Sequence, residues 1–365
     1  MHEKRVDRFF LGIVLLLVLG GFFIFVSASL GLHAREEVRF SSVIINQFGG
    51  LVLGLFAMFL ISRIPVEWFR RYALHFFLFG VFASFLVFVP GLGMAHGGAK
   101  RWIFLGPVTF QPSELLKIGT IIYMSAWFAA VKSKAGTFAK GLMPFLVTVG
   151  IAGVVLLLQP DTDTFIVTAA SALAVYVAAG AKWRHVAIVA LLGVLVLGGV
   201  VLMRPYVLDR VKTFFNPSAD TLDSGWQAEQ SLTAIGSGGV IGKGFGQSSQ
   251  KFGFLPEPIG DSIYAVAAEE FGFTGGLAII VGFLLFLSRG SYIARRAKDP
   301  FSGLLVLGIV IMTVLQSFMN IAAMLAVFPL MGIPLLFISH GGSALLIILA
   351  EMGIVLSVSR HLAKV

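Results

Sequence analysis

Apolar residues form long runs along the whole chain, and short polar segments separate each run from the next. A helix needs about 20 residues to cross a hydrocarbon layer of roughly 30 Å, and most of the runs approach or exceed that length. The predicted spans are residues 9–32, 43–61, 74–89, 113–131, 142–158, 164–180, 185–203, 262–287, 301–328 and 341–359. This pattern predicts an all-α polytopic membrane protein with about ten transmembrane helices.

A long polar segment, residues 204–261, interrupts the pattern between the seventh and eighth predicted spans. Loops longer than about 12 to 15 residues between packed elements are usually functional or disordered. This segment contains aromatic and aliphatic residues that a disordered segment would lack, so we predict a folded functional loop. We expect one transmembrane domain over residues 1–365, with the large extracytoplasmic loop at 204–261 within it.

The composition excludes a soluble globular protein, because 58% of the residues are hydrophobic, only 12% are charged and the mean hydropathy is +0.94. The chain contains no cysteine, which excludes disulfides, haem attachment through cysteine and thiolate metal sites. The large loop is therefore expected to hold its shape by packing.

Basic residues gather in alternate segments between the predicted spans, which sets the expected orientation through the positive-inside rule. If the amino terminus is cytoplasmic, every segment on that side is basic. These segments carry Lys4, Arg5, Arg8, Arg63, Arg70, Arg71, Lys132, Lys134, Lys140, Lys182, Arg184, Arg289, Arg295, Arg296, Lys298, Arg360 and Lys364. We expect both termini in the cytoplasm and the large loop outside. The net charge of +9 belongs mostly to these flanks, so we expect no nucleic-acid partner.

Ionisable side chains inside membrane spans are costly, so each is a candidate for function. Glu114 and Lys117 stand three residues apart at the start of the fourth span, which places them on one helix face. They form either a neutralised pair that fixes helix packing or part of a polar cavity beneath the outer surface. Glu351 lies inside the last span, and no motif accounts for it.

Further acidic residues stand at the outer ends of spans. Asp161 and Asp163 follow Pro160 in a short turn before the sixth span. They either hold a divalent cation, since hard cations prefer oxygen ligands, or belong to a solvated turn that caps the next helix. Asp261 precedes the eighth span, at its outer mouth.

The large loop also contains a glycine run at residues 236–244. The run fails the Walker pattern, because Ser237 replaces the first glycine and Gly244 replaces the serine or threonine. One interpretation is an anion site made by backbone N–H groups, with charge from Lys243 and Lys251 nearby. The other is a hairpin whose glycines allow close backbone packing at the membrane surface.

Five segments of the chain have a distinctive sequence: residues 101–117 (RWIFLGPVTFQPSELLK), 158–161 (LQPD), 230–239 (QSLTAIGSGG), 255–261 (LPEPIGD) and 332–343 (GIPLLFISHGGS). Together they resemble the signatures of the SEDS family, which includes FtsW, RodA and SpoVE. The resemblance covers nearly the whole chain, and residues 101–107 and 215–220 are more similar to FtsW or SpoVE than to RodA. The chain departs from the family pattern at residues 162–163 (Thr-Asp for Leu-Gly), at 259–260 (Ile-Gly for His-Thr) and at His340 (for Tyr).

The resemblance implies a peptidoglycan glycosyltransferase that polymerises lipid II at the outer face of the bacterial cytoplasmic (inner) membrane. It also implies a class B penicillin-binding protein as the transpeptidase partner, together with membrane proteins of the divisome or elongasome. Asp261 matches the essential aspartate of the family.

A sugar on a polyprenyl diphosphate already carries a good leaving group, so one carboxylate can activate the acceptor hydroxyl while cations stabilise the diphosphate. We expect Asp261 to be the general base and a divalent cation (Mg²⁺ or Mn²⁺) to assist, with Asp161 as its ligand. The predicted substrate-binding residues are Arg101, Glu114, Lys117, Lys243, Lys251 and Ser343. The alternatives are a lipid II flippase, in which the polar groups line a translocation path, and a scaffold that recruits partners.

Overall fold

The computed structural model describes residues 6–33, 40–96, 99–105, 108–216 and 224–362. Within these residues, eight helices are long and apolar enough to cross a membrane, and two apolar helices, α4 and α7, are shorter. The ten helices are α1 Arg8–His33, α2 Phe40–Ile61, α4 Ala73–Phe85, α5 Pro112–Val131, α6 Met143–Leu158, α7 Thr162–Ala178, α8 Trp183–Met203, α11 Ile263–Arg295, α12 Pro300–Met324 and α13 Gly342–Ser359. The prediction of an all-α polytopic protein with about ten membrane helices is confirmed.

The predicted spans correspond to these helices one by one, and the largest difference in bounds is at α11. This helix continues to Arg295, beyond the predicted end at residue 287. The prediction followed the apolar run, whereas the helix extends past that run into a polar segment. The shorter helical elements are α3 Val66–Arg71, η1 Leu86–Phe88, η2 Lys132–Gly136, η3 Phe138–Leu142, α9 Pro205–Phe215 and α10 Ser224–Ser237.

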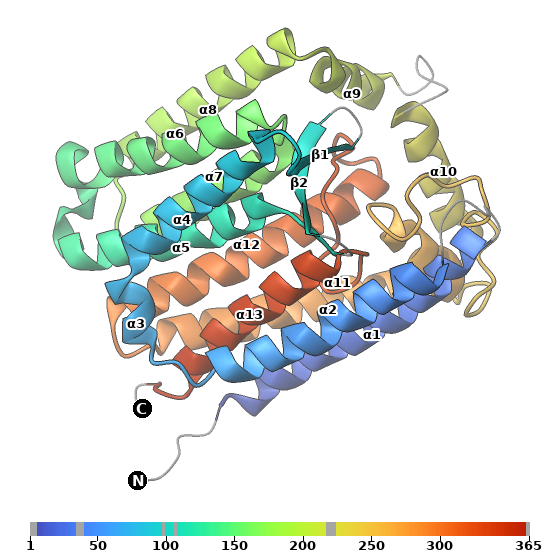
Figure 1. Cartoon of the computed structure of the whole chain (residues 1–365), viewed down its shortest axis with the longest axis horizontal. Coiled ribbons are helices and arrows are strands. Elements are labelled where there is room, and N and C mark those ends of the chain that lie inside the picture. Colours follow the sequence, from blue (N-terminus) through green and yellow to red (C-terminus); the bar gives the residue numbers. More distant parts are fainter. Residues whose placement is uncertain (1–5, 34–39, 97–98, 106–107, 217–223, 363–365) are drawn as a thin grey trace.

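The membrane helices form a bundle of roughly parallel and antiparallel rods with α12 inside it (Figure 1). α12 contacts α5, α7, α11 and α13, while α2 packs along α13 and α4 along α5. α2 and α13 approach closely at Gly50, where an added Cβ would lie 2.5 Å from Gly342 Cα. Such small-residue contacts are typical of membrane helices, which associate by close packing.

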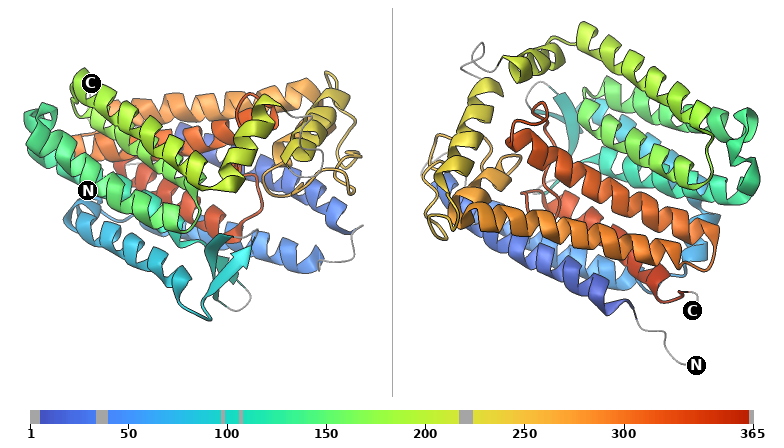
Figure 2. Two further views of the ribbon diagram at one scale, coloured as in Figure 1. Left: turned by 90° about the horizontal axis from the view of Figure 1, so that it is seen from above. Right: turned by 180° about the vertical axis from the view of Figure 1, so that it is seen from behind.

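The helix α8 lies at the edge of the bundle (Figure 2). None of its residues is buried, and the element that it contacts most is α9, which follows it. An apolar helix without buried residues is compatible with a position surrounded by lipid.

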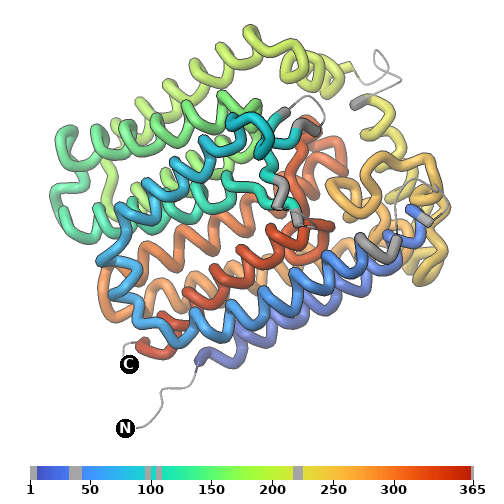
Figure 3. Tube along the Cα trace, in the orientation of Figure 1, coloured from blue at the N-terminus to red at the C-terminus, as the bar shows by residue number. Residues whose placement is uncertain are grey.

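The two ends of the bundle differ, and we name them by what they carry. The terminal face carries the start of α1 and the end of α13, where the Asp7 N–H donates to Ser359 Oγ at 3.0 Å. The loop face carries residues 224–262, whose path in Figure 3 lies at the end of the bundle opposite the two termini. The first and last membrane helices therefore begin and end on the same side.

A small antiparallel sheet, absent from the sequence-based prediction, lies on the loop face. It consists of β1 Gly93–His96, β2 Ala99–Leu105 and β3 Val108–Phe110 in the order β1-β2-β3, and Ile103 pairs with Phe110. The sheet was missed because β1 and β3 have only four and three residues, and the sequence of β2 (AKRWIFL) does not alternate apolar with polar residues. It fixes the position of Arg101.

The glycine run of the large loop packs against a break in α11. At Gly272 the backbone of α11 leaves the helical conformation (φ 66°, ψ −165°), and a Cβ there would lie 2.4 Å from the Gly242 nitrogen. Gly244 N–H donates to the Glu270 carbonyl at 2.9 Å, and Phe273 N–H donates to the Gly239 carbonyl at 2.8 Å. The run therefore serves close backbone packing, as the second interpretation predicted. Residues 217–220, part of the segment compared with FtsW, lie outside the described residues.

Candidate functional site

Three charged side chains meet at Gly332, in the segment between α12 and α13 on the loop face. A Cβ on Gly332 would lie 3.8 Å from Arg101 Nη1, 3.8 Å from Asp163 Oδ2 and 3.8 Å from Asp261 Oδ2. These residues belong to β2, to the first turn of α7 and to the segment before α11. The fold thus brings the predicted general base together with one predicted cation, Arg101, and with a second carboxylate.

A second arginine joins the group from the large loop. Arg210 of α9 lies with Nη1 3.4 Å from Asp163 Oδ2, and the same carboxylate oxygen accepts a hydrogen bond from the Gly332 N–H at 2.9 Å. Asp163 therefore ties α9 to the segment that passes the site. The Arg210 side chain keeps 34% of its surface exposed, so its charge is available to an anion in the site.

Asp161 is held by protein partners. Its Oδ1 lies 3.7 Å from Arg101 Nη1, and its Oδ2 accepts hydrogen bonds from Gln111 at 3.3 Å and Ser113 at 3.2 Å. Arg101 also donates to the Pro160 carbonyl. Because Asp161 and Asp163 are both buried, the interpretation of this turn as solvated is wrong.

The environment of Asp261 raises its proton affinity. Burial raises the pKa of the carboxyl group, the negative charges of Glu257 and Asp163 raise it further, and Arg210 and Arg101 act against them, which gives a pKa of about 7. A carboxyl group with a pKa near neutrality can take up a proton at physiological pH. The N-cap of α11 is Ser262, so Asp261 is not the capping residue of this helix.

The backbone that carries Asp261 is fixed by α12 and by the segment before α13. Asn320 Nδ2 donates to the Asp261 carbonyl at 2.8 Å and to the Ile333 carbonyl at 2.9 Å. Ser339 Oγ donates to the Gly260 carbonyl at 2.8 Å, and the His340 N–H donates to the Ile259 carbonyl at 2.7 Å. These bonds hold the two segments of the site against each other.

Glu114 and Lys117 form a buried ion pair on α5, at 2.9 Å. Lys117 Nζ also donates to Gln316 Oε1 at 2.6 Å, and Gln316 Nε2 donates to the Pro334 carbonyl at 3.4 Å. Gln316 lies one helical turn from Asn320 on α12, so the pair supports the site from one turn deeper.

Glu351 is buried in α13, and its Oε2 has no hydrogen-bond partner among the described residues.

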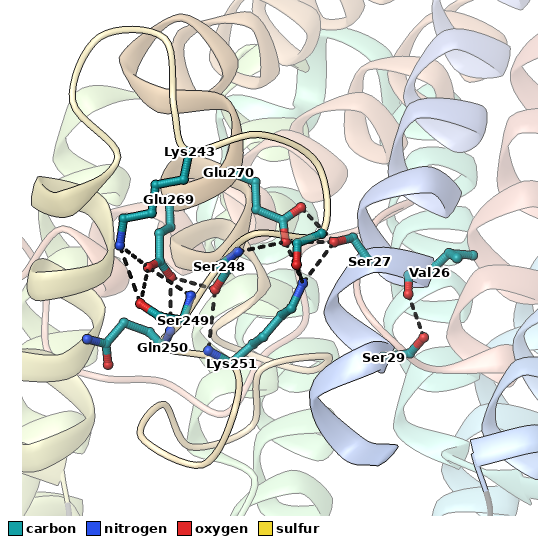
Figure 4. A network of polar contacts seen from close by, with 11 residues as sticks. Val26, Ser27, Ser29, Lys243, Ser248, Ser249, Gln250, Lys251, Glu269 and Glu270 are labelled. Carbon is teal, nitrogen blue, oxygen red and sulfur yellow. Dashed lines mark hydrogen bonds and ion pairs between the residues drawn. The ribbon is translucent and has the colours of Figure 1, made fainter. Parts of the chain in front are cut away.

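Lys243 and Lys251 belong to a separate polar network that fastens the large loop to α11 and α1 (Figure 4). Lys243 Nζ lies 2.6 Å from Glu269 Oε1. Lys251 is completely buried and lies 2.7 Å from Glu270 Oε1 and 3.1 Å from Ser27 Oγ. The structure therefore uses both lysines for internal ion pairs and does not group them with Asp261 at Gly332.

Ser343 is buried in the first turn of α13. Its neighbour Gly342 packs against α2, where a Cβ would lie 2.7 Å from the Asn46 carbonyl oxygen.

Across the described part of the chain, no group of three or more His, Cys, Asp or Glu side chains is arranged to hold a metal ion. Asp163 and Asp261 are the two carboxylates that face the same point.

Sequence reasoning considered Asp163 only as a possible cation ligand beside Asp161, and it did not consider Gln316 or Asn320 at all. Gln316 and Asn320 are amide side chains four residues apart within an apolar span. The same search that selected Glu114 and Lys117 would have found them if it had included uncharged polar residues, which are also costly in a membrane.

Residues 7–364 match the family model of the FtsW, RodA and SpoVE cell cycle proteins. Two similar curated proteins are stage V sporulation protein E of Bacillus subtilis and a probable peptidoglycan glycosyltransferase FtsW of Geobacter sulfurreducens. The first is 36% identical over 85% of this chain and 84% of that protein, and the second is 37% identical over 85% and 83%.

Two solved structures share the fold. One comes from a peptidoglycan synthase complex that coordinates polymerization and crosslinking, with a TM-score of 0.81, 26% identity and coverage of 97% of this chain and 98% of that chain. The other is the rod shape determining protein RodA of Thermus thermophilus, with a TM-score of 0.71, 25% identity and 97% coverage of both chains. By sequence, the chain is closer to FtsW and SpoVE than to these structures.

Proposed function

Because the chain belongs to the SEDS family of FtsW, RodA and SpoVE proteins, we propose that it is a peptidoglycan glycosyltransferase that polymerises lipid II, with Asp261 as the general base. The observation that carries this proposal is the meeting of Asp261, Arg101 and Asp163 at Gly332. A base and cations at one point are what transfer from a sugar diphosphate requires.

The reaction forms a glycosidic bond and releases a polyprenyl diphosphate. Asp261 takes the proton from the acceptor hydroxyl, whose oxygen attacks the anomeric carbon of the donor sugar with inversion. The bond from that carbon to the diphosphate oxygen breaks, and the electron pair leaves with the diphosphate. The charge that develops there is stabilised by Arg101 and Arg210, which flank Asp261 and lower its pKa by their charge.

A divalent cation, Mg²⁺ or Mn²⁺, fits this site when the substrate supplies part of its ligands. Mg²⁺ is commonly held by one or two carboxylates together with substrate phosphates. Asp163 provides a carboxylate at Gly332, and its ion pair with Arg210 and its hydrogen bond from Gly332 N–H both use Oδ2. Asp161, in contrast, is engaged through both oxygens by Arg101, Gln111 and Ser113. Asp163 would therefore hold the cation together with diphosphate oxygens, and Asp261 is kept for the proton transfer. The cation would supply charge neutralisation at the departing diphosphate.

The buried pair of Glu114 and Lys117 is assigned a supporting role. Lys117 is almost fully buried and contacts Gln316, which donates to the Pro334 carbonyl in the segment that passes the site. We therefore place direct contact with the diphosphate at Arg101 and Arg210, and indirect positioning at Lys117.

The proposed setting is the bacterial cytoplasmic membrane, with the loop face outside and both termini in the cytoplasm. The positive-inside distribution supports this orientation, and so does the hydrogen bond that places the start of α1 beside the end of α13. The proposed partner is a class B penicillin-binding protein that crosslinks the strands, within a divisome or elongasome. This follows from the likeness to a chain of a complex that both polymerises and crosslinks peptidoglycan.

The test is polymerisation by the purified chain, with its cognate transpeptidase inactivated, from fluorescent lipid II in proteoliposomes. Glycan chains that require Asp261 support the proposal, and Asp261→Asn should lower the rate by about 100- to 10,000-fold because a general base is lost. Asp209→Asn is the matched control, since Asp209 is an exposed carboxylate of the same loop. Movement of lipid II across the bilayer without chain growth would indicate the flippase, and neither activity would indicate the scaffold.

A further inference from the structure

A cavity of about 690 Å³ lies where α5, α7, α11 and α12 reach the terminal face. Each of these helices has its other end at the Asp261 site, through Ser113, Asp163, Ile263 and Asn320 respectively. Ser113 and Phe128, which lines the cavity, are separated by roughly 22 Å along α5 at about 1.5 Å per residue. The cavity is therefore distinct from the catalytic site and belongs to the opposite membrane face.

The walls of the cavity are apolar, and its cations are two side chains without a carboxylate partner. Phe128, Ala179 and Leu304 contribute to the walls, and Lys132 and Arg295 line the cavity beside them. Both cations are exposed, and neither forms an ion pair within the part of the chain that the structure describes. On the loop face, by contrast, Arg101, Arg210, Lys243 and Lys251 all lie close to a carboxylate.

The backbone at Lys132 is strained, with φ 50° and ψ −127° at the end of α5. A residue with a side chain rarely adopts this conformation, whereas glycine does so at little cost. Residues held in such sparsely populated conformations lower stability, and they cluster at functional sites. The chain therefore keeps a lysine at the cavity in a place where glycine would be more stable.

We propose that this cavity binds an anionic phospholipid of the adjoining leaflet. The lipid phosphate lies between Lys132 and Arg295, the Ser291 hydroxyl faces the head group, and acyl carbons pack against Ala178 and Leu307, which line the cavity and are not buried. Basic pockets between membrane helices on the cytoplasmic side are suited to such head groups, and the cavity volume lies in the range of ligand pockets, about 300–1,000 Å³. A zwitterionic lipid is less suited to the cavity, because its head group would bring a third positive charge towards Lys132 and Arg295.

Binding at this cavity would stabilise the packing of four helices that carry catalytic-site residues at their other ends. The inference does not depend on the proposed function, because it concerns a cavity at the opposite face. It can therefore fail or succeed independently of polymerase activity.

The test compares the full-length protein in nanodiscs of phosphatidylcholine with nanodiscs that also contain phosphatidylglycerol. Native mass spectrometry counts the lipids retained, and thermal unfolding reports stabilisation. We expect one phosphatidylglycerol to be retained and to raise Tm, and we expect its affinity to fall about fivefold for each cation removed, in Lys132→Gly and in Arg295→Gln, at about 1 kcal/mol per cation. Lys134→Ala is the matched control, because Lys134 is an exposed cation of the same turn that does not line the cavity.

Lys132→Gly separates lipid binding from folding. In phosphatidylcholine alone this variant should unfold at the same temperature as the parent or higher, since glycine relieves the backbone strain, while its affinity for phosphatidylglycerol falls. Unchanged phosphatidylglycerol retention in both cavity variants would refute the proposal, and so would an equal loss in Lys134→Ala. Saturation of the same site by inorganic phosphate alone would refute the lipid assignment.

Discussion

The side chain of Asn320 donates a hydrogen bond to the main-chain carbonyl of Asp261 at 2.8 Å, and its second amide proton goes to the Ile333 carbonyl at 2.9 Å. One amide on the central helix α12 therefore fixes the two segments between which the site is formed. The position of the proposed general base therefore depends on a residue that we place outside the reacting groups.

Replacing Asn320 should impair catalysis without removing any charged group. Asn320→Ala leaves two carbonyls without their donor, at about 1–3 kcal/mol for each buried unsatisfied group, and we expect kcat to fall about 10- to 100-fold. Polymerisation kinetics measure the effect, and Ser317→Ala on the same helix is the control, because its hydroxyl bonds only within α12. Equal loss in both variants would show that helix packing, and not the Asp261 backbone, is what matters.

The pH dependence of polymerisation should report Asp261. As the proposed general base, Asp261 would act in its ionised form, and its pKa is about 7 because of burial and the charges of Glu257 and Asp163. We therefore expect kcat/KM to fall about tenfold per pH unit below about pH 7 and to level off above it. Asp163→Asn removes a like charge and releases Arg210, so both changes lower the pKa of Asp261. The acid limb should then move to lower pH, and a shift to higher pH would contradict this account.

Removal of divalent cations should stop polymerisation, and Asp163 should set how much metal is required. After treatment with EDTA, activity is measured against added Mg²⁺ or Mn²⁺. Asp163→Asn should raise the concentration for half-maximal rate several-fold, because the carboxylate proposed to hold the cation is lost. Asp161→Asn provides the comparison. If Asp161→Asn raised the required metal concentration more than Asp163→Asn, Asp161 and not Asp163 would be the metal ligand.

The buried pair of Lys251 and Glu270 should dominate the stability of the large loop. Lys251→Met leaves Glu270 buried without its partner, which we expect to cost about 3–5 kcal/mol. Adding Glu270→Gln removes the stranded charge and should recover much of the loss. Thermal unfolding in detergent measures both variants, and Lys212→Met is the control, since Lys212 is 65% exposed. Failure of the double variant to recover any stability would refute the pairing argument.

The membrane architecture could be predicted from the amino-acid sequence alone. Each of the ten apolar runs became one helix, and Asp261 lies at the mouth of α11 as expected. The length of an apolar run is a local property of the sequence. Because the transfer of apolar residues into lipid dominates the free energy of helix insertion, the membrane spans can be predicted from the sequence. The family motifs also pointed to the segments that meet at Gly332.

The partners of the buried charges, in contrast, follow from the three-dimensional packing and could not be assigned from the sequence. Lys243 and Lys251 are near Asp261 in sequence, yet they pair with Glu269 and Glu270, whereas Arg210 and Asp163 come from distant helices to join Asp261. A buried charge must find an opposite charge or a hydrogen bond close in space, and the sequence distance between two residues does not determine that. Asn320 is detectable in the sequence as a polar residue within an apolar span, but its contact with the Asp261 carbonyl depends on how α12 packs.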